Sequence, residues 1–527
     1  MTKGYVSLIL HSHLPYVRHP EINEAMEERW LFEAINECYI PIIDVYDGLI
    51  NDGIEFKVTM SITPPLMAML EDQYLNERYM KYLNKSIELA NKEVIRTAED
   101  KNLNGVSKFY VERFEGLKKT YEKYDRRLMN AFRKFDNLGV LEVITCSATH
   151  GLLPLLAVNP ETVKAQLAIG VEYYKEVMGH APKGIWLPEC AYTYSLDPIL
   201  KELGIQFFIA ESTSVSNASP RPLYSTAAPI ATQNGVAAFG RDVEAGHQVW
   251  SSFLGYPGDA NYREFYRDIG YELPMDYIKD YIVPSGIRID TGIKYYKITG
   301  NTENKEYYVR ENALERVKIH ADHFAYSRNE QINNLSYYMD KPPIITCPYD
   351  TELYGHWWFE GPDFLNEFIR NAADNWTEFE LTTPKEYLEM YPVTQCSSPS
   401  PASWGESGNF SVWLNGGNDW IYRELHEAAE SMIRLANSFD EPTELEKRAL
   451  AQAARELVLA ESSDWPFIIK HNTTVQYAVK RVNTHLERFK ELYNCLTKNR
   501  LEEKFIKEME DIDNIFPNID YTLYRNN

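Results

Sequence analysis

Apolar residues along the chain fall in short continuous runs, each ending in a polar or turn residue and followed by a longer segment with helical spacing. Seven such runs occur, at residues 5–13, 55–63, 141–151, 184–190, 205–213, 235–242 and 342–352. Continuous apolar strands separated by helices are typical of a parallel sheet covered on both faces. Seven of them indicate a closed or nearly closed barrel, so the pattern predicts an α/β fold of the (β/α)7 barrel type.

Three other segments depart from this alternation. Residues 66–138 are charged, with apolar residues at helical spacing, and predict a helical insertion. Residues 250–310 are rich in Gly, Pro and Tyr and predict a loop-rich excursion near the site. Beyond a Ser/Pro/Gly-rich connection at 396–408, apolar stripes continue to about residue 510. We therefore predict a catalytic barrel over 1–395 that includes both insertions, and a C-terminal helical domain over 396–527.

Polar residues occur at the same end of each predicted strand. They are His11, His13, Thr63, His150, Glu189, Glu211, Asp242 and Asp350. In a parallel barrel the carboxyl ends of the strands build the active site. An open doubly wound sheet uses the same end, so the pattern predicts a site more strongly than it predicts closure of the barrel.

Two acids follow apolar runs directly, Glu189 in "IWLPECAY" and Asp350 in "IITCPYD". A carboxylate withdrawn from water costs several kcal/mol unless it is paired or used. Two carboxyl groups from different strand ends can divide the work of glycosidic cleavage, one as acid and the other as nucleophile or base. The alternative is that each caps a helix or binds an arginine at the rim of the barrel.

The histidines of "HSHLPY" lie on one side of a strand, because side chains alternate with a period of two. His11 and His13, with His150 as a third member, could bind a metal ion, bind sugar hydroxyls or fill a structural role. No acid or cysteine nearby has the spacing of a zinc motif. The residues alone leave the three readings open.

Aromatic residues are abundant, with 37 Tyr and 10 Trp, and flat apolar faces suit sugar rings. Most of them fill a large core. Tryptophans beside polar motifs or between glycines are candidate substrate-binding residues: Trp250, Trp357, Trp404 and Trp413.

Composition narrows the class of partner. The formal charge of −23 argues against nucleic acid and anionic membranes and favours neutral ligands. There is no phosphate-binding glycine motif, no G-x-S-x-G elbow, and no apolar stretch near the roughly 20 residues that span a bilayer. The N-terminus has no cleavage signal, and six scattered cysteines suit a reducing compartment, so we predict a cytoplasmic protein.

Taken in order, five motifs resemble those of glycoside hydrolase family 57, most closely its α-1,4-glucan branching enzyme group. They are "HSHLPY" at 11–16, "ATHGLLPLL" at 148–156, "WLPECAY" at 186–192, "YDTELYGHWWFEGP" at 349–362 and the segment around Trp404. The resemblance implies a (β/α)7 barrel with a helical insertion and a C-terminal helical domain. It also implies action on α-glucans with net retention and no metal or other cofactor.

The resemblance assigns roles by motif position. Glu189 resembles the nucleophile and Asp350 the general acid/base, while His11, His13 and His150 resemble histidines around the cleaved sugar, which favours hydroxyl and carboxylate partners over a metal. Trp30, Trp404 and Trp413 resemble substrate-binding tryptophans. Branching members carry a tyrosine on a mobile loop that shields the intermediate. Its counterpart is not identified here, since residues 213–250 contain only Tyr224.

The sequence therefore predicts a retaining 1,4-α-glucan branching enzyme that acts on an amylose-like or glycogen-like substrate. An amylase-like α-1,4-glucan hydrolase is the alternative within the family. A non-catalytic carbohydrate-binding protein and a metal-dependent deacetylase-like barrel are remote alternatives. The sequence gives no prediction of the oligomeric state.

Overall fold

A strand is present in each of the seven predicted apolar runs. The computed structural model describes residues 2–251, 254–376 and 378–526. The seven strands are β1 (Gly4–Ser12), β2 (Val58–Ile62), β3 (Leu141–Ile144), β4 (Gly184–Trp186), β5 (Phe207–Ala210), β7 (Ala237–Gly240) and β8 (Ile344–Asp350). The paired neighbours among them all run parallel. All nine residues of β1 are buried, as expected for a strand covered on both faces.

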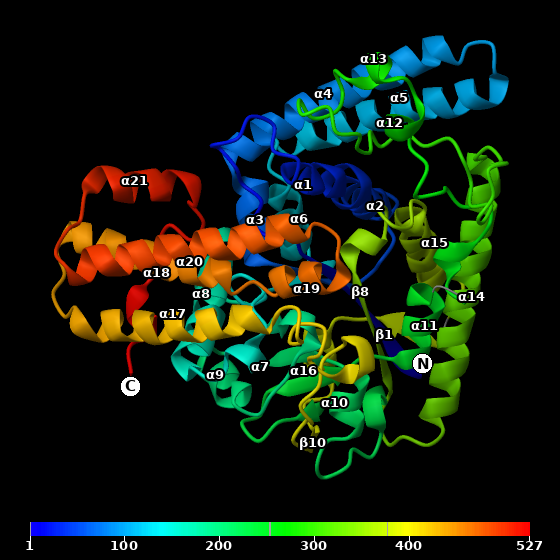
Figure 1. Ribbon diagram of the computed structural model, residues 1–527. Coiled ribbons are helices and arrows are strands. Elements are labelled where there is room, and N and C mark those ends of the chain that lie inside the picture. Colours follow the sequence, from blue (N-terminus) through cyan, green and yellow to red (C-terminus); the bar gives the residue numbers. More distant parts are fainter. Residues whose placement is uncertain (1, 252–253, 377, 527) are drawn as a thin grey trace.

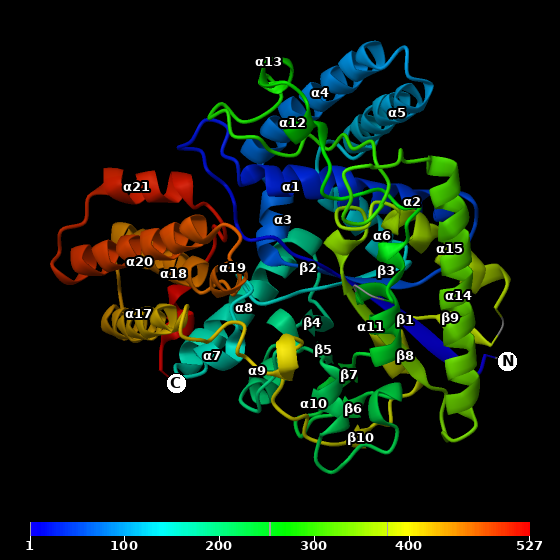
Figure 2. The same ribbon diagram turned by 45° about the vertical axis from the view of Figure 1, so that its right-hand side comes forward.

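The strands form two sheets that together surround the core (Figure 2). One sheet has the order β3-β2-β1-β8, and the other contains β4, β5 and β7. Two narrow seams join the sheets. At one seam the Trp186 N–H donates to the Thr145 carbonyl (2.8 Å), and at the other the Asp242 N–H donates to the Thr346 carbonyl (2.9 Å). The sequence thus predicted the seven strands and a nearly closed barrel correctly, and the structure shows that the ring consists of two sheets joined at these seams.

Three short strands extend these sheets at their edges. β9 (Phe379–Leu381) pairs with the first residues of β1, while β6 (Ile230–Ala231) and β10 (Gln395–Cys396) continue the second sheet beyond β7. Helices α14 (Arg310–Ser336) and α15 (Gly361–Asp374) pack on each other beside β1 and β9. On the opposite side of the molecule from α14 and α15 lie the C-terminal helices, with α7 (Leu153–Leu156), α8 (Pro160–Met178) and α9 (Leu196–Glu202) between them and the strands (Figure 2).

Helix α8 (Pro160–Met178) fixes the chain that leaves β3. A Cβ atom at Gly170 would lie 2.3 Å from the Cys146 carbonyl oxygen, so only glycine allows this approach. The Gln166 carbonyl then accepts a hydrogen bond from the Ala148 N–H (2.8 Å). These contacts hold the segment that leads to His150.

The predicted helical insertion contains α3 (Pro64–Glu71), α4 (Gln73–Arg96), α5 (Lys101–Lys123) and α6 (Met129–Asn137). In the predicted loop-rich excursion, α12 (Ile269–Glu272) and α13 (Met275–Ile278) lie over α4 and α5 (Figure 1). Its tyrosines bind glutamates of α4, since the Tyr277 hydroxyl donates to Glu93 and the Tyr281 hydroxyl to Glu88, both at 2.8 Å.

A continuous helical segment follows the loop after β1 and borders the candidate site. It consists of α1 (Glu28–Ala34), the π-helical turn η1 (Ile35–Tyr39) and α2 (Ile40–Asn51). π-Helical turns inside α-helices are frequent at functional sites.

The C-terminal helices are α17 (Asp419–Ser438), α18 (Glu444–Ala460), α19 (Asp464–His471), α20 (Val475–Thr497) and α21 (Glu503–Ile512). They form a layer beside the sheets, and the two chain ends lie on opposite sides of the molecule (Figure 1). Arg18, in the loop after β1, donates to the carbonyls of Asp511 (2.7 Å) and Ile512 (2.8 Å). Among the described residues, no helix has the length and apolar character needed to cross a membrane.

Candidate active site

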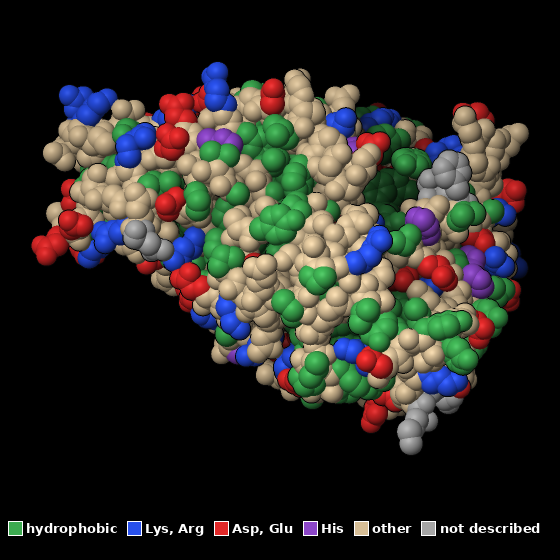
Figure 3. All heavy atoms as spheres, turned by 90° about the horizontal axis from the view of Figure 1, so that it is seen from below, with side chains coloured by type: hydrophobic (Ala, Val, Ile, Leu, Met, Phe, Trp, Pro, Cys, Tyr) green, Lys and Arg blue, Asp and Glu red, His purple; other side chains and the backbone are tan. Residues whose placement is uncertain are grey.

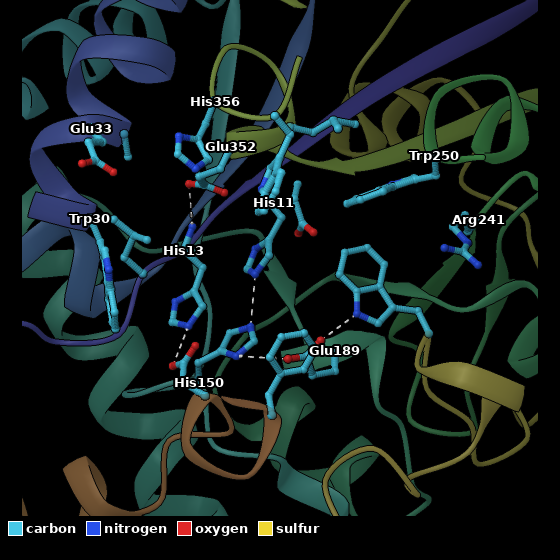
Figure 4. Close-up of a pocket in the computed structure, with 18 residues that line it drawn as sticks. His11, His13, Trp30, Glu33, His150, Glu189, Arg241, Trp250, Glu352 and His356 are labelled. Carbon is cyan, nitrogen blue, oxygen red and sulfur yellow. Dashed lines mark hydrogen bonds and ion pairs between the residues drawn. The ribbon is translucent and has the colours of Figure 1, made fainter. Parts of the chain in front are cut away.

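A pocket of about 670 Å³ opens at the carboxyl ends of the strands. Its lining residues are His11, His13, Leu14, Trp30, Glu33, Ala34, His150, Glu189, Arg241, Trp250, Asp350, Glu352, Leu353, His356, Trp357, Trp404, Asp464 and Phe467. Figure 3 shows a hollow lined by hydrophobic side chains on the face seen from below, and Figure 4 shows the lining residues. Nine of the ten candidate site residues line this pocket, and Trp413 does not.

Glu189 is presented by a strained turn after β4. The residue has φ 59° and ψ 26°, a left-handed conformation that is uncommon for a glutamate. Trp404 holds it twice: the indole Nε1–H donates to Glu189 Oε2 (2.7 Å), and the Trp404 backbone N–H donates to the Glu189 carbonyl (2.9 Å). Strain of this kind costs about 1–3 kcal/mol and persists where surrounding contacts fix it, as in active sites.

Asp350 ends β8 and pairs in register with His11 of β1. Burial, together with the nearby carboxyls of Glu352 and Glu189, raises the pKa of Asp350 well above its usual value. Burial also raises the pKa of Glu189 to about 7, although the hydrogen bond from Trp404 lowers it. The surroundings of Asp350 thus favour its protonated form, which a proton donor requires.

Glu352 is a third carboxyl in the pocket. The Tyr39 hydroxyl, from the π-helical turn, donates to Glu352 Oε1 (2.5 Å), and the His13 N–H donates to the same oxygen (3.3 Å). Burial raises the pKa of Glu352 to about 7. Its like charge beside Asp350 favours the protonated form of that acid.

The three predicted histidines form a stack in the pocket. The rings of His13 and His150 have centroids 3.9 Å apart and lie 15° from parallel, and His11 stacks on Trp186 at 4.4 Å. Every ring nitrogen of the three has a protein partner. A sugar hydroxyl would have to replace one of these partners in order to bind a histidine nitrogen.

His13 and Asp464 form an ion pair, with 3.0 Å between Nε2 and Oδ2. Burial disfavours the charged form of both groups, but the attraction between the two opposite charges is stronger. Asp464 raises the pKa of His13, and His13 lowers the pKa of Asp464 to about 2. The other two histidines are neutral, because burial and neighbouring histidines lower their pKa values well below 6.5.

The residues that could hold a metal ion lie elsewhere. Among the described residues, the compact group of potential ligand side chains is Glu456, His485 and Asp513, inside the C-terminal helices. Asp513 is ion-paired there with Arg488 and lies 3.9 Å from Arg481, so the charge of this group is already compensated by guanidinium groups.

Aromatic side chains flank the central acids on both sides. Trp30 and Trp250 lie on opposite sides of Glu189 and the histidines (Figure 4). Trp250 is 41% exposed and Trp357 is 53% exposed, with Trp357 stacked on Phe265 at a centroid distance of 4.5 Å. Such exposed flat faces are available to sugar rings on either side of the acids.

The position of Trp413 differs from the one expected of a substrate-binding tryptophan. It is 1% exposed and packs with Leu152, Ala191 and Val412. A turn in which the Trp413 N–H bonds the Phe410 carbonyl (3.0 Å) directs the indole inward, where it lies so close to Gly405 that a Cβ there would be 2.6 Å from it. Trp413 supports the loop of Trp404 and presents no face to the pocket.

The sequence interpretation missed several lining residues. Asp464 lies in the C-terminal helical segment, where a single acid at a helix start has no distinguishing signal. Glu352 lies inside the motif at 349–362 but was not singled out. Arg241 follows the β7 run and pairs with Glu211 (2.9 Å), while Glu33, with a pKa that burial raises to about 7, faces the pocket from α1.

Tyr224 lies away from this pocket. Its hydroxyl accepts a hydrogen bond from the Asp340 N–H (3.4 Å), four residues before β8 begins. That position is at the amino ends of the strands, whereas the pocket is at their carboxyl ends. Tyr224 therefore does not shield Glu189 in this structure.

Two family descriptions match the sequence. Residues 7–332 match "Glycosyl hydrolase family 57", and residues 424–524 match "1,4-alpha-glucan branching enzyme, C-terminal".

The similar solved structures are titled either as an α-amylase or as branching enzymes. An α-amylase of Thermotoga maritima is 43% identical with a TM-score of 0.94, covering 100% of both chains. Branching enzymes of Pyrococcus horikoshii and Thermococcus kodakaraensis, the latter in complex with glucose, are 32% and 31% identical. Their TM-scores are 0.89 and 0.90, and each comparison covers 100% of this chain and 97% of the other.

Proposed function

Because the chain belongs to glycosyl hydrolase family 57, we propose that it is a 1,4-α-glucan branching enzyme, which cleaves α-1,4 bonds and rejoins the released segment as an α-1,6 branch. The carrying observation is the pair Glu189 and Asp350, with different surroundings, in a pocket flanked by exposed tryptophans. Similarity to branching enzymes over nearly the whole chain and the C-terminal match support the transfer reaction.

The first half-reaction forms a covalent intermediate. A Glu189 oxygen attacks the anomeric carbon C1 while the C1–O4 bond breaks, and Asp350 gives its proton to the departing O4. The raised pKa of Asp350 supports its role as the acid, and the hydrogen bond that Trp404 Nε1–H donates to Glu189 supports its role as the nucleophile.

The second half-reaction releases the sugar to an acceptor. Asp350, now a carboxylate, takes the proton of a glucan 6-hydroxyl as O6 attacks C1 and the bond from C1 to Glu189 breaks. Two inversions at C1 give net retention. One α-1,4 bond is lost and one α-1,6 bond is formed, and no water is consumed.

Transfer between chains needs room for a donor and an acceptor. The aromatic faces lie on both sides of the acids, with Trp30 on one flank and Trp250 on the other (Figure 4), and Trp357 and Phe467 also line the pocket. We assign these flanks to the two glucan segments that meet at Glu189. An α-glucan carries no charge, so the net charge of −23 on the protein does not repel it, as it would repel an anionic partner.

An amylase-like hydrolase is the second candidate. The Thermotoga maritima structure, titled an α-amylase, is 43% identical over the full length. In addition, the lone tyrosine of residues 213–250 lies outside the pocket, so it does not exclude water from the intermediate. Hydrolysis would use the same acids, with water in place of the 6-hydroxyl.

The two reactions are separated by incubating amylose with the enzyme and following iodine staining, reducing ends, and chain release by a debranching enzyme. A branching enzyme lowers the stain while reducing ends stay nearly constant, and debranching then releases short chains. Reducing ends that rise in step with the loss of stain, with nothing for the debranching enzyme to release, would establish the hydrolase. Glu189→Gln is the control, since it removes the nucleophile but keeps the size of the side chain.

We also propose that this reaction takes place in the cytoplasm, in the synthesis of a glycogen-like polysaccharide. All six cysteines are unpaired, which suits a reducing compartment.

A further inference from the structure

The loop after β8 is held against the π-helical turn η1 at the edge of the pocket. Three consecutive residues of the turn make the contacts. Glu37 Oε2 lies 2.5 Å from His356 Nδ1. The Cys38 thiol donates to the Glu352 carbonyl (3.6 Å), and the Tyr39 hydroxyl donates to Glu352 Oε1 (2.5 Å). The turn therefore fixes two side chains that line the pocket, those of Glu352 and His356.

Gly355 allows this loop to lie directly on the turn. Its φ of 122° is in the region that favours glycine, and a Cβ atom there would be 1.8 Å from the Glu37 carbonyl oxygen. Any side chain at this position would separate the two backbones and move His356 away from Glu37. The close approach of loop and turn is thus part of how the His356 ring is placed.

The ring of His356 is fixed by the protein but keeps one nitrogen for a ligand. Glu37 accepts from Nδ1–H, and Phe265 of the loop-rich excursion packs against the ring at 81°, with a centroid distance of 5.3 Å. Nε2 has no hydrogen-bond partner among the described residues, and the side chain is 27% exposed and lines the pocket. Trp357, which stacks on the same Phe265, has its ring centroid 5.3 Å from that of His356.

These two neighbours match the two parts of a sugar. An exposed indole face suits the apolar face of a sugar ring, and a sugar hydroxyl can donate to or accept from an imidazole nitrogen. Burial lowers the pKa of His356, but the ion pair with Glu37 raises it above the usual value, which favours a donating Nε2–H. Arg263, 3.7 Å from Glu37, further favours the ionised form of that carboxyl.

The position of His356 relative to the two acids indicates which glucan segment it meets. Its loop begins directly after Asp350, the acid assigned to the departing oxygen and then to the acceptor hydroxyl. Figure 4 shows His356 and Glu352 together at one end of the pocket, away from Glu189. His356 is therefore on the side of Asp350 and not on the side of the carboxylate that holds the cleaved sugar.

We propose that His356 binds a hydroxyl of the glucan on the leaving side of the cleaved bond, with Trp357 stacked on the sugar, and that Glu37 is a positioning residue for His356. This inference rests on the proposed function, in which the departing segment and the later acceptor both meet Asp350. One subsite then serves both half-reactions: it holds the segment that leaves and afterwards the segment that receives the branch.

Two substrates separate the two sides of the cleaved bond. Amylose places a glucan on the leaving side, whereas α-maltosyl fluoride places only fluoride there. His356→Phe keeps a ring that can pack on Phe265 but has no nitrogen. We expect its loss of kcat/KM on amylose, followed by iodine staining, to exceed its loss on α-maltosyl fluoride, followed by fluoride release, by about 10- to 100-fold. This is the size of one hydrogen bond to a charged group, and it should arise mainly from KM.

Glu37→Gln tests the positioning role. Glu37 does not line the pocket, so a larger loss on amylose than on α-maltosyl fluoride must act through His356, and we expect a smaller difference than in His356→Phe. His180→Phe is the matched control, because His180 pairs with Asp136 in the same way (2.8 Å) but is 46% exposed and does not line the pocket. Thermal unfolding shows whether each variant is folded.

The proposal is overturned if folded His356→Phe loses kcat/KM equally on the two substrates, or if it keeps the wild-type kcat/KM on amylose. Equal losses in Glu37→Gln would overturn the positioning role of Glu37. A wild type that only hydrolyses amylose would instead overturn the proposed transfer reaction, and the two substrates would still decide the role of His356, since hydrolysis also has a leaving segment.

Discussion

Glu189 and Asp350 are both partly buried carboxyls, but among the hydrogen bonds of the described residues only the Glu189 carboxylate accepts one, from Trp404 Nε1–H. The sequence located both acids, because each follows an apolar run. It could not predict their different surroundings, because Trp404 is 215 residues further along the chain from Glu189. Assignment of the two roles from physical contacts therefore requires the structure.

The pH profile should report this difference. Glu189 must be ionised to attack, and its pKa is about 7, so kcat/KM should rise as the pH increases through about 7. Asp350 must be protonated to donate, and burial with the neighbouring carboxyls raises its pKa, so kcat/KM should fall again once the pH is high enough to deprotonate Asp350. Initial rates on amylose between pH 5 and 10 check this. A rate that is highest at pH 5 would contradict the assignment.

At the scale of elements, the strand ends were predictable and α19 was not. The succession of apolar runs predicted that the carboxyl ends of the seven strands lie on one side of the sheets. Helix α19 starts with Asp464, preceded by Ser463 at its N-cap, and the two residues contact His13 and His150 from a separate helical segment. An amphipathic pattern shows which face of a helix is buried, but not which distant strand lies against that face.

Asp464→Asn should loosen this junction in a pH-dependent way. The lowered pKa of Asp464 stabilises the fold above 3.8, and this is lost as the pH falls through about 2. The raised pKa of His13 stabilises the fold below 6.5, and this is lost as the pH rises through its folded value. The variant should lose about 3 kcal/mol near pH 5.5, as for a partner removed from a buried ion pair, and less near pH 9.

Thermal unfolding of the variant and wild type at the two pH values measures this effect. Asp440→Asn, whose side chain is 93% exposed, is the matched control in the same helical segment. Equal losses of stability at pH 5.5 and pH 9 would show that the ion pair with His13 is not the cause.

On the scale of the whole molecule, the C-terminal segment closes onto the first loop of the barrel. Arg18 binds the carbonyls of Asp511 and Ile512, and Arg481 donates to the Tyr16 carbonyl (3.3 Å). The loop they hold follows the strand that carries His11. The sequence predicted a helical domain after residue 396, but its contacts with residues 14–18 depend on single polar atoms that leave no periodic pattern.

Asp513 is central to this closure, and Asp513→Ala should destabilise the protein. It is fully buried beside Arg481, Arg488 and His485, and its removal leaves buried guanidinium charge without its partner. We expect a loss of about 3 to 5 kcal/mol in the free energy of unfolding. Asp511→Ala, which keeps the backbone carbonyl bound by Arg18, is the control in denaturant unfolding, and equal stability of the two variants would contradict the account.

The most direct test of the central claim is to trap the sugar on Glu189. An activated, slowly released substrate such as a 5-fluoro-α-glucosyl or α-maltosyl fluoride should inactivate the enzyme, and mass spectrometry of its peptides should find one glycosyl group on Glu189. The label should be absent from Glu189→Gln and should persist longer in Asp350→Asn, which lacks the base for release. Turnover of the reagent with inversion at C1, or a label on another residue, would contradict the assignment of Glu189 as the nucleophile.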